Sequence, residues 1–226
     1  KILSLIVYNF GNNFSVSSLK IKRYIQQNCL FKKFKKIQIL ENFIDTERFY
    51  NSNKKKFKNK IIMINRISKE KNIEFIIEGI KGTSIEVDII GEGEEKSYLS
   101  KLAKKHRVKL NFLGSKDNVF IPKYLNLYHV YVISSKIEGN VKTLLEAMAC
   151  ELICIGTNVD GIKNIIQNKI TGLTVKNPNE LKTRLLRIFK NVHQFKNLGK
   201  NGRRRVLRLN SIDAFFKQEL KLIGNL

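Results

Sequence analysis

The chain has 226 residues, of which 42% are hydrophobic and 27% are charged, and it contains only two prolines. This composition excludes wholesale disorder, collagen-like sequence and a disulfide scaffold, and the length is enough for a substantial core. The longest apolar stretch, 2–8, is far shorter than the roughly 20 residues of a spanning helix, so we expect no membrane-spanning segment. Because Lys1 comes first and no small-residue cleavage site follows, we expect no signal peptide.

The charge balance is the unusual quantity, because 43 Lys and Arg against 19 Asp and Glu give a formal net charge of +24. Such a potential attracts polyanions, either nucleic acid or an anionic membrane surface. The alternative is codon usage, since Lys, Asn and Ile are abundant together. The basic clusters are spread along the chain without the interleaved aromatic residues of a base-stacking surface. We therefore favour codon usage, place peripheral contact with an anionic membrane second, and expect no specific nucleic-acid binding.

The three cysteines, Cys29, Cys150 and Cys154, lie in apolar surroundings. An odd number in such surroundings favours reduced core residues of a cytoplasmic protein over a disulfide or a metal site. The three histidines show no partner pattern, and we expect them to be structural or on the surface.

From residue 60 onward, short apolar runs alternate with segments of helical periodicity. We expect strands at 61–64, 85–90, 109–113, 130–133, 152–155 and 173–175. The helical segments between them carry the apolar residues of 73–80, 94–106, 144–149, 162–166 and 181–192. Near-continuous apolar strands that alternate with helices predict a parallel sheet covered on both faces. With right-handed crossovers, this is an α/β, Rossmann-like doubly wound domain.

Four parts are predicted along the chain. Residues 1–50 hold one or two strands and a helix-like segment, which is too little for an independent domain. The polar stretch 51–59 is a linker, and 60–192 form the doubly wound domain. Residues 193–226 form C-terminal helices, and the last of them, capped by Ser211, places apolar residues on one face. We expect that face to pack back toward the N-terminal part.

Ligands of such folds bind beyond the carboxyl ends of the strands, so the residues directly after each strand are the candidates. Gly91 and Gly93 follow a predicted strand and precede a helix, where backbone N–H groups can approach a phosphate. Lys96 stands where the third glycine of a dinucleotide fingerprint would be. We therefore expect a tight turn that borders a ligand, not a site for NAD.

The run 135–149 carries two glutamates that we expect to face one ligand. Glu138 is expected on the loop after a strand. Glu146 is expected just over one turn inside the following helix, with its side chain leaning back toward the helix start. The alternative is an acidic residue at a helix N-terminus and a solvent-facing glutamate. Glu146, however, is flanked by apolar residues, where an unpaired carboxylate is costly.

Between these glutamates, Gly139 permits close approach of the backbone to a ligand. The free N–H groups of residues 140–144, at the start of the helix, would face an anion. A nucleotide diphosphate with a sugar at each end fits this arrangement.

Five motifs in order cover roughly residues 40–190, and together they resemble one known family. They are Asn-Phe-Ile-Asp at 42–45, Asn-Arg through Glu-Lys-Asn at 65–72, Ile-Ile-Gly-Glu-Gly at 89–93, Phe-Leu-Gly at 112–114, and the run from 135 through Glu-Ala-Met-Ala to 162. The sequence is similar to the C-terminal, donor-binding half of a retaining family 4 glycosyltransferase of the GT-B fold. That resemblance implies two facing Rossmann-like domains with the active site in the cleft between them.

The resemblance also implies roles for individual residues. Arg66 and Lys71 would clamp the donor diphosphate, and Glu138 would contact hydroxyls of the transferred sugar; these three are the expected catalytic residues. Glu146 would hold the ribose hydroxyls. The remaining donor-binding positions would be Gly91, Gly93, Gly114, Gly139, Asn140, Val141, Thr143 and Leu144, mainly through their backbone groups.

The chain departs from the family pattern at several positions. Asn65 replaces a glycine, Asn140 and Val141 stand where an aromatic and a small residue or proline are usual, and Glu151 begins the segment that replaces Gly-Leu-Pro. Losing a glycine after a helix costs about 1 kcal/mol, which the fold can tolerate. The larger departure is that 1–50 would be only a remnant of the acceptor domain.

The implied function is transfer of a sugar from a nucleotide-sugar, with UDP expected, to a glycan or lipid-linked acceptor with retention of configuration. This would serve polysaccharide or glycolipid biosynthesis, at the inner membrane face or in the cytoplasm. We expect no cofactor and no metal, because the chain has no Asp-x-Asp triplet. Two alternatives stay open: a catalytically inactive remnant, and a basic protein that binds nucleic acid or a membrane surface.

Overall fold

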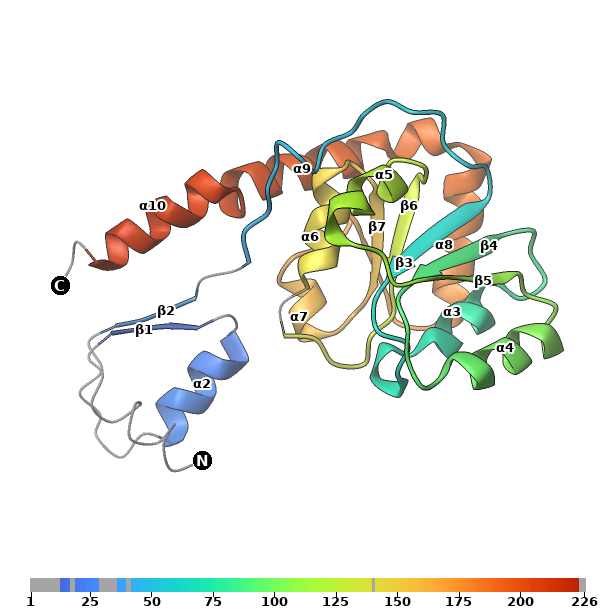
Figure 1. Ribbon diagram of the computed structural model, residues 1–226, viewed down its shortest axis with the longest axis horizontal. Coiled ribbons are helices and arrows are strands. Elements are labelled where there is room, and N and C mark those ends of the chain that lie inside the picture. Colours follow the sequence, from blue (N-terminus) through green and yellow to red (C-terminus); the bar gives the residue numbers. More distant parts are fainter. Residues whose placement is uncertain (1–12, 17–18, 29–35, 40–41, 140, 224–226) are drawn as a thin grey trace.

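A computed structural model of the chain describes residues 13–16, 19–28, 36–39, 42–139 and 141–223. Its centre is a six-stranded parallel sheet with the order β5-β4-β3-β6-β7-β8 (Figure 1). The strands are β3 (Lys60–Ile64), β4 (Glu86–Ile90), β5 (Leu110–Gly114), β6 (Val130–Ile133), β7 (Ile153–Thr157) and β8 (Leu173–Val175). Counted within the sheet, this is the 3-2-1-4-5-6 order of a Rossmann fold. The predicted α/β doubly wound fold is confirmed.

Helices cover both faces of the sheet, and each face has its own apolar core. One face packs against α3 (Ile73–Ile80), α4 (Lys96–Lys105) and α8 (Pro178–Lys190). The other packs against α5 (Ile121–Leu125), α6 (Lys142–Ala149), α7 (Asp160–Lys163) and α9 (Lys196–Leu209). In β3, Ile61 and Met63 point into the first core and Ile62 and Ile64 into the second. Burial on both faces therefore explains the unbroken apolar runs in the sequence.

The sequence predicted helices within 193–226 but gave no bounds for α9, and the packing shows why. Its buried positions are two glycines and one valine, so no wide apolar stripe marks it. A Cβ at Gly199 would lie 2.2 Å from the carbonyl oxygen of Glu151, and Gly202 lies close to Met148 of α6. The helix backbone thus packs directly against the domain, which the usual apolar periodicity does not report.

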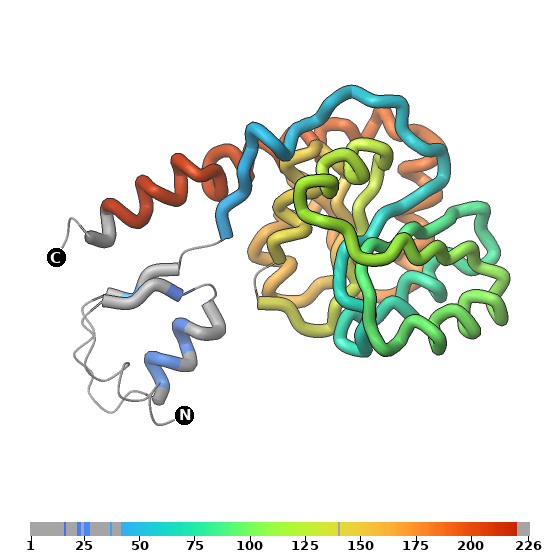
Figure 2. Tube along the Cα trace, in the orientation of Figure 1, coloured from blue at the N-terminus to red at the C-terminus, as the bar shows by residue number. Residues whose placement is uncertain are grey.

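The C-terminal helix α10 (Ile212–Ile223) follows α9 and lies beside the segment 42–50 (Figure 2). Ser211 caps it, because the N–H of Ala214 donates to Ser211 Oγ at 3.2 Å. Phe43 and Phe215 stack with their ring centroids 5.1 Å apart, and Ile44 forms a β-bridge with Ser211. The division of the chain into four parts stays a prediction.

Within the described residues of the N-terminal part are two short parallel strands and a helix. They are β1 (Asn13–Val16), α2 (Leu19–Asn28) and β2 (Lys36–Ile39), and 3₁₀ turns elsewhere are η1 (Lys69–Lys71), η2 (Asn118–Phe120) and η3 (Val192–Phe195). In the described part of the chain no helix is both long and apolar enough to cross a bilayer. Cys150 and Cys154 are buried free thiols, whereas Cys29 lies outside the described residues.

A buried cluster of hydrogen bonds around Asp88 joins β4 to β5 and to the residues just before β6. Asp88 on β4 is 4% exposed and accepts hydrogen bonds from Tyr128 Oη at 2.5 Å and Asn111 Nδ2 at 2.6 Å. The Lys60 ammonium adds a contact at 3.7 Å. Burial and the carboxylate of Asp88 both raise the pKa of Tyr128.

We predict that Tyr128→Phe lowers the free energy of unfolding by about 1.5–3 kcal/mol, because the buried Asp88 carboxylate loses a charge-assisted hydrogen bond. The measurement is chemical denaturation followed by circular dichroism. Tyr50→Phe is the matched control, because Tyr50 is 49% exposed, and its effect should stay within about 0.5 kcal/mol. Equal effects of the two substitutions would contradict the assignment.

Candidate functional site

The loops after β3 and β4 are held together by backbone contact at the carboxyl edge of the sheet. A Cβ at Gly91 would lie 1.9 Å from the carbonyl oxygen of Asn65, and one at Gly93 would lie 2.2 Å from that of Ile67. The N–H of Ile67 donates to the carbonyl oxygen of Glu92 at 2.9 Å. The glycine pair therefore positions the loop that carries Arg66, so both positions require glycine.

Gly114 continues this turn from the end of β5. Its φ is +72°, and its carbonyl oxygen accepts the N–H of Gly91 at 3.0 Å. Gly91 itself has a φ of +139°. Gly91, Gly93 and Gly114 thus lie in the loops at the ends of β4 and β5. The atoms nearest to them belong to the backbone of the loop after β3 and to the Glu92 side chain.

Lys71 and Glu138 meet at the carboxyl edge, 67 residues apart in sequence. Lys71 Nζ lies 2.5 Å from Glu138 Oε1, and the hydroxyl of Ser135 donates to the same oxygen at 2.5 Å. The two side chains are 22% and 11% exposed. Ser134 Oγ donates to the carbonyl oxygen of Lys71 at 2.7 Å, which ties the two loops together. The structure therefore forms a partly buried ion pair between two predicted catalytic residues.

Gly161 at the start of α7 determines where the Glu138 loop lies. A Cβ at this position would lie 2.2 Å from the carbonyl oxygen of Glu138 and 2.6 Å from its carbonyl carbon. Thr157, at the end of β7, donates its hydroxyl to the carbonyl oxygen of Ser135 at 2.7 Å. The sequence assigned no role to Gly161 or Thr157, although both lie within the motif run 135–162.

Glu146 lies inside helix α6 and is only 2% exposed. Asn118 Nδ2 donates to its Oε1 at 3.3 Å, and the guanidinium of Arg48 in turn donates to Asn118 Oδ1. Burial raises the pKa of Glu146, while the Asn118 hydrogen bond and the charges of Lys142 and Arg48 oppose that rise. The buried Nε of Arg48 has no hydrogen-bond partner among the residues that the structure describes. Sequence reasoning missed Arg48 and Asn118.

Between the two glutamates, helix α6 begins without a side-chain cap. Its N-cap residue Val141 is buried and makes no cap hydrogen bond through its side chain. A Cβ at Gly139 would meet nothing within 4 Å, so this stretch of backbone is open to a ligand. Thr143 instead shares a hydrogen bond with Tyr131 Oη at 2.9 Å, and the Leu144 side chain lies in the core. Only the backbone of these two residues remains for a ligand, and Asn140 lies outside the described residues.

Arg66 stands apart from the Lys71–Glu138 pair. Its side chain is 72% exposed, and its guanidinium lies 3.4 Å from the carboxylate of Glu94, which is 58% exposed. Such a surface ion pair contributes little free energy, so reorientation of the guanidinium toward a ligand would cost little. The structure therefore brings together Lys71 and Glu138 but not Arg66.

The structure is thus a doubly wound α/β domain with cationic and acidic side chains at the carboxyl edge of its sheet, where domains of this class bind their ligands. The profile of the family "Glycosyl transferases group 1" matches residues 45–205. The chain belongs to this family. The predicted family resemblance is thereby confirmed.

Two individual proteins are also similar to this chain, each at 28% identity. The N-acetyl-alpha-D-glucosaminyl L-malate synthase of Bacillus anthracis is 28% identical over 194 residues, which cover 78% of this chain and 50% of that protein. The UDP-Gal:alpha-D-GlcNAc-diphosphoundecaprenol alpha-1,3-galactosyltransferase of Escherichia coli is 28% identical over 164 residues, covering 62% and 41%. The chain spans about half the length of the curated relatives that it matches.

The fold is also shared with solved structures. Anabaena Alr3699/HepE in complex with UDP and glucose superposes with a TM-score of 0.83 at 13% identity, covering all of this chain and 66% of that protein. Sucrose-phosphate synthase from Thermosynechococcus elongatus superposes with a TM-score of 0.85 at 20% identity, covering 99% of this chain and 60% of that one. The predicted fold of one GT-B half is confirmed.

We predict that Glu146→Gln raises the free energy of unfolding at pH 7–8. The folded-state pKa of Glu146 is raised, so the native state holds its proton more tightly, and stability falls as the pH rises above the ordinary glutamate value of about 4.3. The amide removes this penalty, and its oxygen can still accept from Asn118. Denaturation at pH 4 and pH 7.5 should show the gain only at the higher pH, whereas the exposed control Glu47→Gln should show none.

A second prediction separates the two glycines that flank Glu138. Gly161→Ala should lower the free energy of unfolding by about 1–3 kcal/mol, because its Cβ overlaps the Glu138 backbone. Gly139→Ala should leave stability within about 0.5 kcal/mol of the parent, because its Cβ meets nothing. Denaturation of both variants measures the contrast, and a stable Gly161→Ala would show that this contact does not hold the loop.

Proposed function

We propose that this chain provides the donor-binding part of a glycosyltransferase that moves a sugar from a UDP-sugar to a hydroxyl acceptor with retention of configuration. The observation that carries the proposal is the partly buried Lys71–Glu138 pair beside the open backbone of Gly139 and the uncapped start of α6. Cation, acid and free N–H groups thus converge on one edge of the sheet.

The phosphate groups would be bound by Lys71 and by the N–H groups at the start of α6. A cation held in place and a helix N-terminus both stabilise the negative charge that develops on a leaving diphosphate. Exposed Arg66 would turn from Glu94 to join them when the donor binds. In this arrangement Lys71, Arg66 and the helix N-terminus supply the positive charge, so the proposal includes no metal and no other cofactor.

The two glutamates would hold the sugars on either side of the diphosphate. Both hydrogen bonds of Glu138 within the described part of the chain end on Oε1, so Oε2 can accept from a hydroxyl of the transferred sugar. Glu146, on the far side of Gly139, would accept from the ribose hydroxyls. A ribose would also add hydrogen bonds to the buried carboxylate, for which Asn118 is the donor within the described part of the chain.

Retention would follow if the acceptor hydroxyl attacks from the face that the diphosphate leaves. The sugar would pass through an oxocarbenium-like state, while the departing phosphate accepts the acceptor proton. Support for UDP comes from the Anabaena complex with UDP and glucose and from the donor named for the Escherichia coli relative.

That relative's name also contains a diphosphoundecaprenol acceptor, which supports a lipid-linked acceptor here. We propose a cytoplasmic location with peripheral contact at the inner membrane face, in polysaccharide or glycolipid biosynthesis, with the net charge of +24 as the attraction. A chain that binds UDP-sugars but transfers nothing would favour the alternative of an inactive remnant.

We predict that Lys71→Met weakens binding of UDP-glucose or UDP-N-acetylglucosamine by tenfold or more, and lowers transfer about 10²–10³-fold where transfer occurs. Calorimetric titration measures the binding. Lys69→Met is the matched control, because Lys69 lies in the same 3₁₀ turn and is exposed. Lys71→Arg should retain part of the affinity, since it keeps the charge. If Lys71→Met binds as the parent does, or if no UDP-sugar binds to the parent, the proposed donor site is wrong.

A further inference from the structure

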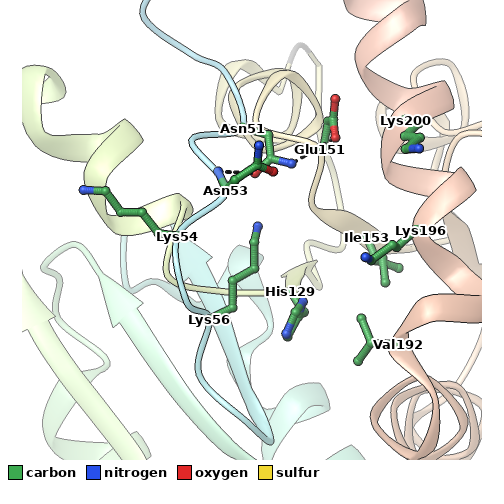
Figure 3. A pocket seen from close by; sticks show the side chains of 10 residues that line it. All are labelled: Asn51, Asn53, Lys54, Lys56, His129, Glu151, Ile153, Val192, Lys196 and Lys200. Atoms are coloured by element: carbon green, nitrogen blue, oxygen red, sulfur yellow. Dashed lines mark hydrogen bonds between the residues drawn. The ribbon is translucent and has the colours of Figure 1, made fainter.

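A second hollow, of about 410 Å³, lies at the opposite edge of the sheet from the donor site. It opens between the segment that precedes β3 and helix α9, beside the residues where β6 and β7 begin (Figure 3). Ile153, the first residue of β7, and His129, just before β6, lie at its inner side. Because β6 has four residues, about 13 Å of strand separates this edge from the carboxyl edge. A ligand here would not contact Lys71 or Glu138.

Lysine side chains dominate the lining of this hollow. Lys54 and Lys56 come from the segment before β3, and Lys196 and Lys200 lie one turn apart on α9. Among the described residues, none of these four ammonium groups has a carboxylate within ion-pair distance. Like charges at i and i+4 on a helix repel each other, so this arrangement destabilises α9 unless an anion lies between them.

Lys56 is the preorganised member of this group. Its side chain is half-buried and reaches into the space between the loop and α9, and its ammonium donates to the carbonyl oxygen of Tyr128 at 3.1 Å. Burial lowers the pKa of Lys56. The half-buried His129 has its pKa lowered first by burial and then by the positive charges of Lys56 and Lys196. The electrostatic potential inside the hollow is therefore positive, and partial burial reduces its screening by water.

One carboxylate stands at the rim. Glu151 has a φ of +59°, in the left-handed region that favours glycine, and its carboxylate accepts from Asn51 Nδ2 at 3.0 Å. The sequence thus keeps an acid at a position where the backbone would favour glycine. With four lysines and a single acid, the lysines and the glutamate alone leave an excess of three positive charges in the hollow.

We propose that this hollow binds a phosphate-bearing anion, in addition to the donor at the other edge of the sheet. Several lysines that converge from two segments match a compact, multiply charged oxyanion, because each ammonium is a point charge with three donors. A soluble pyrophosphate or phosphate ester and a phospholipid headgroup share this chemistry. A hollow of about 410 Å³ is too small for a nucleic-acid duplex, which needs a broad exposed face.

The test is a titration of the full chain with inorganic pyrophosphate, followed by residue-resolved NMR of backbone amides. Residue resolution is needed because pyrophosphate can also bind at the donor edge. Binding in the hollow should shift the amides of 51–56, 129 and 196–200. It should also raise the pKa of His129, because the anion neutralises the charges that lower it. His106, which contacts Glu78 elsewhere, is the internal reference.

A matched pair of variants separates this site from general electrostatic attraction. Lys196→Gln with Lys200→Gln should weaken pyrophosphate binding in the hollow by tenfold or more, since each charged hydrogen bond contributes substantially. Lys101→Gln with Lys104→Gln removes the same charge from exposed positions of α4 and should change it less than about twofold. Glu151→Gln should strengthen pyrophosphate binding by about twofold or more, because it removes the competing negative charge.

A second arm uses vesicles of phosphatidylcholine with phosphatidylglycerol, in a sedimentation assay with the same variants. Binding to vesicles that depends on Lys196 and Lys200, without binding of pyrophosphate, identifies a lipid headgroup as the source of the phosphate. Binding of pyrophosphate alone identifies a soluble phosphate compound. If neither probe binds in the hollow, or if both double variants weaken binding equally, the proposal is overturned.

Discussion

Direct backbone contact between loops at the carboxyl edge of the sheet is the constraint on which the site depends. Three positions lack a side chain where another loop passes within about van der Waals distance: Gly91, Gly93 and Gly161. Gly91 and Gly93 fix the loops after β3 and β4 against each other, and Gly161 fixes the loop after β6 against the start of α7. The hydrogen bond from Ser134 Oγ to the carbonyl oxygen of Lys71 joins the two pairs of loops, so that Lys71 and Glu138 meet although 67 residues separate them. Without such contacts, a flexible lysine would lose considerable side-chain entropy on forming this pair.

Glu146 lies where the free protein does not favour its charge. Glu146 is buried against an asparagine, with arginine and lysine charges that offset its desolvation only in part. Glu138 is compensated more fully, because an ammonium and a hydroxyl both contact one of its oxygens. Groups held in this way gain hydrogen bonds when a polar ligand arrives, whereas solvated groups must first lose water. The burial of Glu146 is thus more consistent with a binding role than with a structural one.

The sequence predicted the fold well because its signals are local or repeat along the chain. Strands buried on both faces give unbroken apolar runs, and the loop-then-helix placement of Glu138 and Glu146 follows from the spacing around Gly139. What it missed depends on contacts between distant segments. Asn118 reaches Glu146 across 28 residues, and Arg48 reaches Asn118 across 70. No local pattern in the sequence encodes such pairs. Helix α9 packs through glycines, so it carries no wide apolar stripe that would mark its bounds.

The same topology separates two regions of positive charge. Parallel strands place every carboxyl end on one edge, where backbone N–H groups and Lys71 face the expected diphosphate, and every amino end on the other, where the lysine hollow lies. The net charge of +24 is therefore not spread evenly, since part of it lies at the partly buried Lys71 and part of it lies in the lysine hollow. There the attraction for an anion is stronger and less screened by salt than on an open surface. Codon usage can explain how many lysines the chain has, but the folding of two distant segments around Lys56 is a property of the structure.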